Sequence, residues 1–177
     1  MKLTELARKT IEASFYGKKF EVAESVKKKY GKPGTSFVTL TEKKTGDLRG
    51  CIGSLEAVQP LYADIMANAL NAAFRDPRFF PLSKDELKDV KIEVSVLSEA
   101  KMLKYKDEED LLGKLNHKIG IILKKGYATA TFLPQVWEQL PDKIDFLEHL
   151  SLKAGLNKDA WKSAEIWYYN VKVEKER

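Results

Sequence analysis

The sequence has few residues that could ligate a metal or form a disulfide. Its 177 residues include one cysteine, Cys51, and two histidines, His117 and His149. One cysteine cannot form an intramolecular disulfide, and no pair of these residues has the spacing of metal ligands. No phosphate-binding loop is present either. We therefore expect neither a metal site nor a bound cofactor, and a lone free cysteine is typical of the reducing cytoplasm.

Long apolar runs are also missing. No stretch approaches the roughly 20 apolar residues that cross a bilayer, and Asp64 and Asn68 interrupt the longest apolar helical segment. The first residues, Met1–Glu5, lack the apolar core of a signal peptide. We therefore expect a cytoplasmic protein without a membrane-spanning segment.

Neither sign of charge dominates the chain. There are 31 Lys and Arg residues against 26 Asp and Glu, a net charge of +5, and the two signs are interspersed. Because nucleic-acid-binding surfaces usually show clustered basic residues, nucleic-acid binding is the weakest of the functional hypotheses. The single cysteine, the few amides and the abundant lysine and glutamate are typical of a heat-adapted source.

The hydrophobic pattern changes repeatedly between helical spacing and alternation. Ser83 and Glu86 have the spacing of a capping box, and Asp107 and Asp142 are candidate helix caps. Helices are expected over residues 3–15, 20–30, 60–75, 107–115 and 142–155, and strands over 35–42, 48–55, 90–96, 119–123, 127–133 and 165–173. Because these elements do not alternate as βαβ units, the pattern predicts an α+β fold with a largely antiparallel sheet of about six strands flanked by helices.

The length of the chain is suited to one main domain over residues 1–177. The pattern is weakest between Gly17 and Gly34, where the helix expected over residues 20–30 is short and has weak periodicity. A smaller subdomain is therefore expected around residues 17–59 within that domain, so that the protein has two unequal subdomains.

The most informative segment is Leu48–Gly53, with the letters LRGCIG, on a strand after a hairpin loop. Cys51 has three interpretations: a buried packing residue, an activated thiol, or the wall of a ligand pocket. Gly50 and Gly53 lack a Cβ and could let a ligand approach the backbone. Arg49 could lower the pKa of the thiol, bind an anion or form a cross-strand ion pair. In a regular strand its side chain points to the opposite face, and a bulge would change that geometry.

A second dense segment, Arg75–Leu82, holds two arginines and two phenylalanines between prolines that stiffen the loop. Arg75 and Arg78 are candidates for binding an anion or a partner. In the alternative interpretation, the segment is a rigid connector in which Asp76 pairs with an arginine while Phe79 and Phe80 fill the core.

Three further residues are considered for the same site. Gln135, after Pro134, could line a cleft through its amide, although a helix-starting proline explains the pair equally well. A catalytic cysteine normally needs a base. His149 is interpreted as a surface residue on a helix, whereas His117 could reach the edge of a sheet.

These segments together resemble the AMMECR family, whose prokaryotic members are also named AmmeMemoRadiSam system protein A. Its hallmark is LRGCIG, which this chain matches letter for letter. The similarity extends over nearly the whole chain, through Ala72–Phe79 with Pro81 and Leu82, Ile92–Ser98, Phe132–Val136, Phe146–Leu150 and Leu152–Leu156.

The resemblance implies a compact protein of two unequal subdomains, with no established biochemical activity for the family. It also implies a Memo-like protein and a radical S-adenosylmethionine protein as partners. We expect a ligand-binding or catalytic module with a cleft at Leu48–Gly53, in which Cys51 is the candidate catalytic residue. The alternative is a noncatalytic module that docks onto such a partner, and whether the protein is an enzyme stays open.

Overall fold

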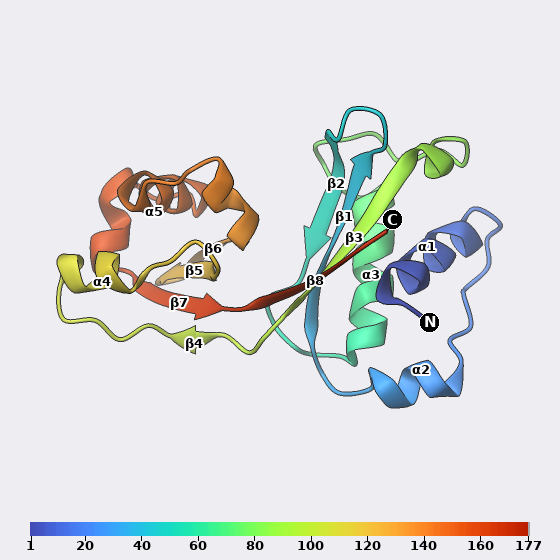
Figure 1. Cartoon of the computed structure of the whole chain (residues 1–177), viewed down its shortest axis with the longest axis horizontal. Coiled ribbons are helices and arrows are strands. Elements are labelled where there is room, and N and C mark those ends of the chain that lie inside the picture. The colour runs from blue at the N-terminus through green and yellow to red at the C-terminus, as the bar shows by residue number, and fades with distance from the viewer. Residues whose placement is uncertain (177) are drawn as a thin grey trace. The chain divides into compact units, whose positions relative to one another are not determined.

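The computed structural model describes residues 1–176, which form helices and two four-stranded sheets (Figure 1). The predicted α+β class is confirmed, with two sheets in place of one sheet of about six strands. The chain divides into two units, Met1–Leu97 with the residues from Lys172 onward, and Ser98–Val171. Residues 17–59, where a smaller subdomain is expected from the sequence, lie inside the first unit.

The sheet of the first unit has the strand order β2-β1-β3-β8. Its strands are β1 (Thr35–Glu42), β2 (Leu48–Gly53), β3 (Val90–Leu97) and β8 (Val171–Lys175). β1 pairs antiparallel with both β2 and β3, which leaves β2 at the edge. The single strand expected over 165–173 is two strands that belong to different sheets, β7 (Glu165–Tyr169) and β8, separated by Asn170.

The helices of the first unit cover one face of its sheet. They are α1 (Leu3–Ser14), α2 (Glu24–Lys29), α3 (Leu61–Phe74) and the short 3-10 helix η1 (Glu86–Asp89). Val38 and Leu40 of β1 share a buried cluster with helical residues such as Leu6 and Ile65. Because side chains alternate along a strand, Phe37 and Thr39 point to the opposite face. We call this second face, which carries no helix among the described residues of the first unit, the helix-free face.

The second unit has its own sheet, of order β4-β7-β5-β6, and its own core. Its remaining elements are β4 (Lys101–Met102), α4 (Glu108–Lys114), β5 (Gly120–Lys125), β6 (Ala128–Phe132), η2 (Pro134–Glu138), α5 (Lys143–Lys153) and η3 (Lys158–Ser163). Phe146 of α5 stacks on Trp137 with ring centroids 3.6 Å apart, and both rings are buried. Burial of such large rings is a main source of stability for a core.

The predicted helix caps are present. The Asp107 carboxylate accepts a hydrogen bond from the Asp110 N–H, and Asp142 accepts bonds from two backbone N–H groups of α5. Ser83 and Glu86 form the reciprocal bonds of a capping box, at 2.7 and 3.2 Å. None of the described helices combines the length and the apolar character needed to cross a membrane.

Candidate functional site

The segment Leu48–Gly53 forms the edge strand β2 of the first sheet. Its register with β1 shifts between Leu40, which faces Gly50, and Thr41, which faces Leu48. Arg49 is therefore the extra residue of a β-bulge, so the regular alternation that would point its side chain away from the thiol does not apply. The bulge is the irregularity that the sequence analysis left open.

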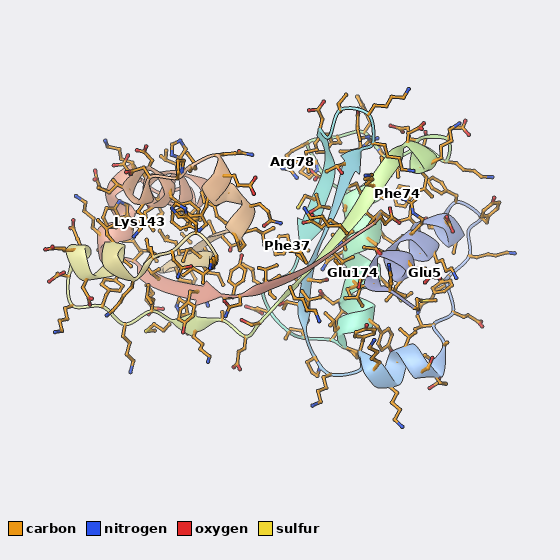
Figure 2. All side chains as sticks on the ribbon, in the orientation of Figure 1. Glu5, Phe37, Phe74, Arg78, Lys143 and Glu174 are labelled. Carbon is orange, nitrogen blue, oxygen red and sulfur yellow. The ribbon has the colours of Figure 1, made fainter. Side chains whose placement is uncertain are left out.

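The backbone of Cys51 is held at both of its polar groups. Its N–H donates to Asp76 Oδ2 at 2.9 Å, and its carbonyl accepts from Arg78 Nη2 at 3.2 Å. Both partners come from the loop that follows α3, and Figure 2 labels Arg78 beside the first sheet. Exposed edge strands invite pairing with other chains. Here the loop occupies the free edge at Cys51.

The thiol of Cys51 lies on the helix-free face. Its neighbours Gly50 and Ile52 face the helices, because they pair with Leu40 and Val38, whose side chains are in the buried core. Since the polar backbone groups of Cys51 point away from β1, it forms a non-hydrogen-bonded pair with Thr39, in which side chains approach closely. Cys51 Sγ is accordingly 3.3 Å from Thr39 Oγ1.

An ion pair between the buried carboxylate of Asp76 and the half-exposed guanidinium of Arg78 lies beside Cys51. Arg78 donates from Nε and Nη2 to the two oxygens of Asp76, at 2.9 and 2.7 Å. These bonds, together with those from the N–H groups of Cys51 and Arg78, lower the pKa of Asp76 to about 2. The pKa of Arg78 is raised, first by its hydrogen bonds to Asp76 and further by the negative charge of that carboxylate. Arg78 is therefore a permanent cation close to Cys51.

The Arg49 side chain is committed to an ion pair. Nε and Nη2 donate to Glu86 Oε1 at 3.2 and 3.1 Å, and the arginine side chain is only 12% exposed. Hydrogen bonds from Ser83 and Arg49 lower the pKa of Glu86. The ring of Phe79 lies near both Arg49 and Arg78, 5.9 and 5.5 Å from their guanidinium carbons, within the range of cation–π contacts.

The two glycines of the segment are contacted by the protein itself. A Cβ on Gly50 would stand 2.2 Å from the backbone oxygen of Ala72 in α3, and a Cβ on Gly53 would stand 2.2 Å from the ring of Phe37. α3 makes a close approach at Gly50, and the Phe37 ring makes one at Gly53. Neither glycine leaves an open space beside its backbone, so both have a packing role.

The remaining candidates are not all part of this cluster. Arg75 is exposed on the loop after α3, whereas Gln135 lies in η2 of the second unit. His117 and His149 belong to the second unit as well, where His117 stacks on Trp137. The prediction that Phe80 fills the core is wrong, because this residue is 90% exposed. Its position in a loop between prolines turns the ring toward solvent, and only Phe79 is partly buried.

A buried polar cluster surrounds Asp64 of α3 and was not predicted from the sequence. The carboxylate is 1% exposed and accepts from five donors. They are the N–H and hydroxyl of Ser36, the hydroxyl of Ser54, the Gln59 amide and the Asn68 amide. Because Ser54 follows Gly53 directly, this network ties the end of β2 to α3. In the sequence this network is indicated only by Asp64 and Asn68, two polar residues four positions apart on an otherwise apolar helix.

The fold and the site define an α+β protein of two units, in which an edge strand with a clamped cysteine faces an arginine-bearing loop. A sequence profile of the AMMECR1 family matches residues 4–174, so the chain belongs to this family. The resemblance inferred from the motifs is thereby confirmed.

Individual relatives agree over almost the full length. The chain is 38% identical over 182 residues to protein NEQ441 of Nanoarchaeum equitans, covering 99% of each chain. It is 39% identical over 168 residues to a protein of Aquifex aeolicus, covering 94% of this chain and 86% of that protein. The crystal structure of the uncharacterized protein PH0010 from Pyrococcus horikoshii is similar with a TM-score of 0.91 at 30% identity, covering 99% of this chain and 90% of that one.

Proposed function

We propose that the helix-free face around Cys51 binds a small anionic molecule and that the thiol is one of its contacts. The observation that carries this proposal is the clamp on residue 51, whose N–H and carbonyl are bound at 2.9 and 3.2 Å by the side chains of Asp76 and Arg78. A group held in one position before binding loses little entropy when a ligand arrives.

The arginines of the following loop would supply the attraction for an anion. The Arg78 side chain is 53% exposed although it pairs with Asp76, and Arg75 is exposed and makes no ion pair among residues 1–176. A guanidinium matches the geometry of carboxylates and phosphates. Arg49 is assigned a positioning role, because Glu86 already occupies its guanidinium.

We propose binding as the function in preference to nucleophilic catalysis. A cysteine nucleophile is usually activated by an adjacent base, most often histidine. The carboxylate bonded to the Cys51 N–H, that of Asp76, has a pKa of about 2 and is a weak base, and the group 3.3 Å from the thiol is the hydroxyl of Thr39. The thiol is therefore interpreted as a contact residue.

The proposal is tested by titrating the 15N-labelled protein with succinate, citrate and inorganic phosphate. We expect saturable shifts of the Cys51 and Arg78 amide signals with at least one of these anions. Arg78→Gln should abolish them, Arg78→Lys should retain weakened binding, and Lys28→Gln on α2 should change nothing. If none of the three anions shifts the signals of residues 49–53 and 75–78 more than sodium chloride at equal ionic strength does, the proposal is wrong.

A noncatalytic docking function is the second candidate, and the exposed ring of Phe80 favours it. This ring is 90% exposed beside Arg78, and aromatic and arginine side chains are enriched at protein interfaces. The resemblance suggests a Memo-like protein or a radical S-adenosylmethionine protein as the partner. Co-elution of the purified proteins in gel filtration, lost in Phe80→Ser and kept in Tyr127→Ser, would support docking. No co-elution with either partner would exclude them.

A further inference from the structure

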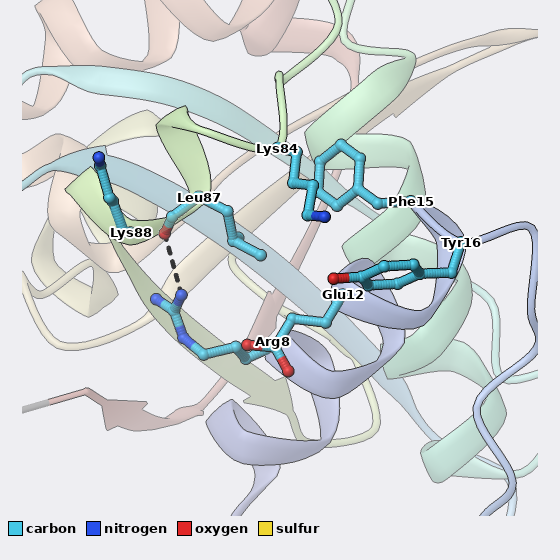
Figure 3. Close-up of a pocket in the computed structure, with 7 residues that line it drawn as sticks. All are labelled: Arg8, Glu12, Phe15, Tyr16, Lys84, Leu87 and Lys88. Carbon is cyan, nitrogen blue, oxygen red and sulfur yellow. Dashed lines mark hydrogen bonds between the residues drawn. The ribbon is translucent and has the colours of Figure 1, made fainter.

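A separate pocket of about 430 Å³ lies in the first unit, between the end of α1 and the segment that leads into η1 (Figure 3). Phe15 and Tyr16 line it from the α1 side, and Lys84 and Leu87 line it from the η1 side. Its volume falls within the range of small-molecule binding sites. None of its lining residues belongs to the cluster around Cys51.

The apolar walls of this pocket are formed before any ligand arrives. The Phe15 ring packs edge-on against Phe74, with centroids 5.3 Å apart and an interplanar angle of 85°. Leu87 is only 6% exposed, so it too is held by the core, whereas the Tyr16 ring is 63% exposed. An aromatic ligand would find one fixed ring, one accessible ring and an aliphatic wall, which is a surface suited to stacking.

Arg8 also lines the pocket, but its guanidinium is already bonded to other groups of the protein. Its Nε and Nη2 atoms each donate to a Glu176 oxygen at 2.6 Å, and its other bonds go to the carbonyls of Leu87 and Val90 at 3.0 and 2.9 Å. The bond to Leu87 is drawn in Figure 3. Because its partners surround it, Arg8 gives the wall rigidity and does not serve as an anion receptor.

Lys84 is the lining lysine whose ammonium lies beside the aromatic rings of the pocket. Its Nζ lies 4.3 Å from the centroid of the Tyr16 ring, and it makes no ion pair among residues 1–176. In Figure 3 the ammonium of Lys84 points toward the rings of Phe15 and Tyr16, whereas that of Lys88 points away from them. An ammonium beside aromatic rings suits a ligand that is both aromatic and negatively charged.

The backbone that carries Lys84 is itself fixed. The reciprocal Ser83–Glu86 bonds close the turn around it, and Arg49 holds Glu86 from β2. The carboxylate of Glu12 also lines the pocket and repels negative charge, so the repulsion grows with each charge that a ligand carries. A single charge is therefore favoured over a polyanion.

We propose that this pocket binds a planar aromatic molecule with one negative charge, of the aryl carboxylate class. The ring would lie against Phe15 and Tyr16, and the carboxylate would pair with Lys84. This site and the proposed anion site at Cys51 involve different residues, so either proposal can fail without the other.

The test uses 2-naphthoate as the charged probe and 2-naphthalenemethanol as its neutral counterpart, with calorimetry for affinity and amide chemical shifts for location. We expect saturable binding of 2-naphthoate with shifts confined to residues 8–16 and 83–88. Lys84→Gln should weaken 2-naphthoate binding by roughly fivefold, the size of an exposed ion pair, and leave binding of the alcohol unchanged. Lys28→Gln, which removes another exposed charge from α2, should bind both probes as the wild type does.

Two outcomes would overturn this proposal. One is the absence of saturable 2-naphthoate binding, or shifts that lie mainly outside residues 8–16 and 83–88. The other is equal affinity of the wild type and Lys84→Gln for 2-naphthoate, which would show that the ammonium does not recognise the charge. Because Lys84 is exposed and makes no buried contact, its replacement is not expected to unfold the protein.

Discussion

The Asp76 carboxylate joins the backbone of Cys51 to the guanidinium of Arg78, with bonds of 2.9 Å to the Cys51 N–H and of 2.7 and 2.9 Å to Arg78. One buried side chain thus connects the edge strand to the loop after α3. Because its four donors, which include the Arg78 N–H, lie on two segments that are distant in sequence, the geometry around the thiol depends on this carboxylate.

Asp76→Asn should destabilise the protein by about 2 kcal/mol. Breaking a buried ion pair costs roughly 3–5 kcal/mol, and the effect is smaller here because Arg78 is half exposed. Urea unfolding measures the change, with the exposed Asp85→Asn as the matched control, for which we expect less than about 0.5 kcal/mol. If Asp76→Asn lowers the free energy of unfolding no more than Asp85→Asn does, the Asp76 carboxylate does not hold the edge strand and the loop together.

Acid should weaken the fold through the same residue. The pKa of Asp76 is lowered from 3.8 to about 2 in the folded protein, so the folded state favours the ionised carboxylate. Its contribution to the free energy of unfolding is present above pH 4 and is lost as the pH falls toward 2. Between pH 5 and pH 2 the free energy of unfolding should therefore fall less steeply for Asp76→Asn than for the wild type. An equal pH dependence of the two proteins would refute the assignment.

Gly50→Ala should be strongly destabilising, by about 2–3 kcal/mol, because its Cβ would stand 2.2 Å from the Ala72 carbonyl oxygen. Gly113 offers a matched control within helix α4, since a Cβ there meets nothing within 4 Å. Gly113→Ala should stabilise the protein by about 0.5–1 kcal/mol through helix propensity. If Gly50→Ala is as stable as the wild type, the packing role of Gly50 is wrong.

Asp64→Asn should cost about 2–3 kcal/mol. An asparagine brings two N–H groups of its own into a site where five donors already converge, so buried donors lose their acceptor. Denaturant unfolding provides the measurement. Asp145→Asn, at an exposed position of α5, serves as the control, and equal stability of the two variants would mean that the network contributes little.

Local signals predicted the elements well. Alternation located β3, and the spacing of Ser83 and Glu86 predicted the capping box that is observed. Each of these features depends on residues close together in the sequence, which is why a single sequence contains enough information for them.

Nonlocal contacts escaped prediction. Gly50 is covered by α3, which packs against the sheet. Asp64 is buried with donors from β1 and from the segment after β2. The split of the final strand at Asn170 reflects pairing with two different sheets. An ion pair was one of the interpretations of Arg49, and it is present, but its partner Glu86 is 37 residues away in the sequence and was not identified.

The most direct test of the anion site compares two reagents on the only cysteine of the chain. Iodoacetate carries a negative charge and iodoacetamide does not, so the ratio of their reaction rates with Cys51 reports the local potential. We predict that the rate with iodoacetate divided by the rate with iodoacetamide is at least about threefold higher in the native protein than in the urea-unfolded chain. This ratio should be reduced in Arg78→Gln and unchanged in Lys28→Gln. A native ratio equal to or below that of the unfolded chain would contradict an anion-binding site at Cys51.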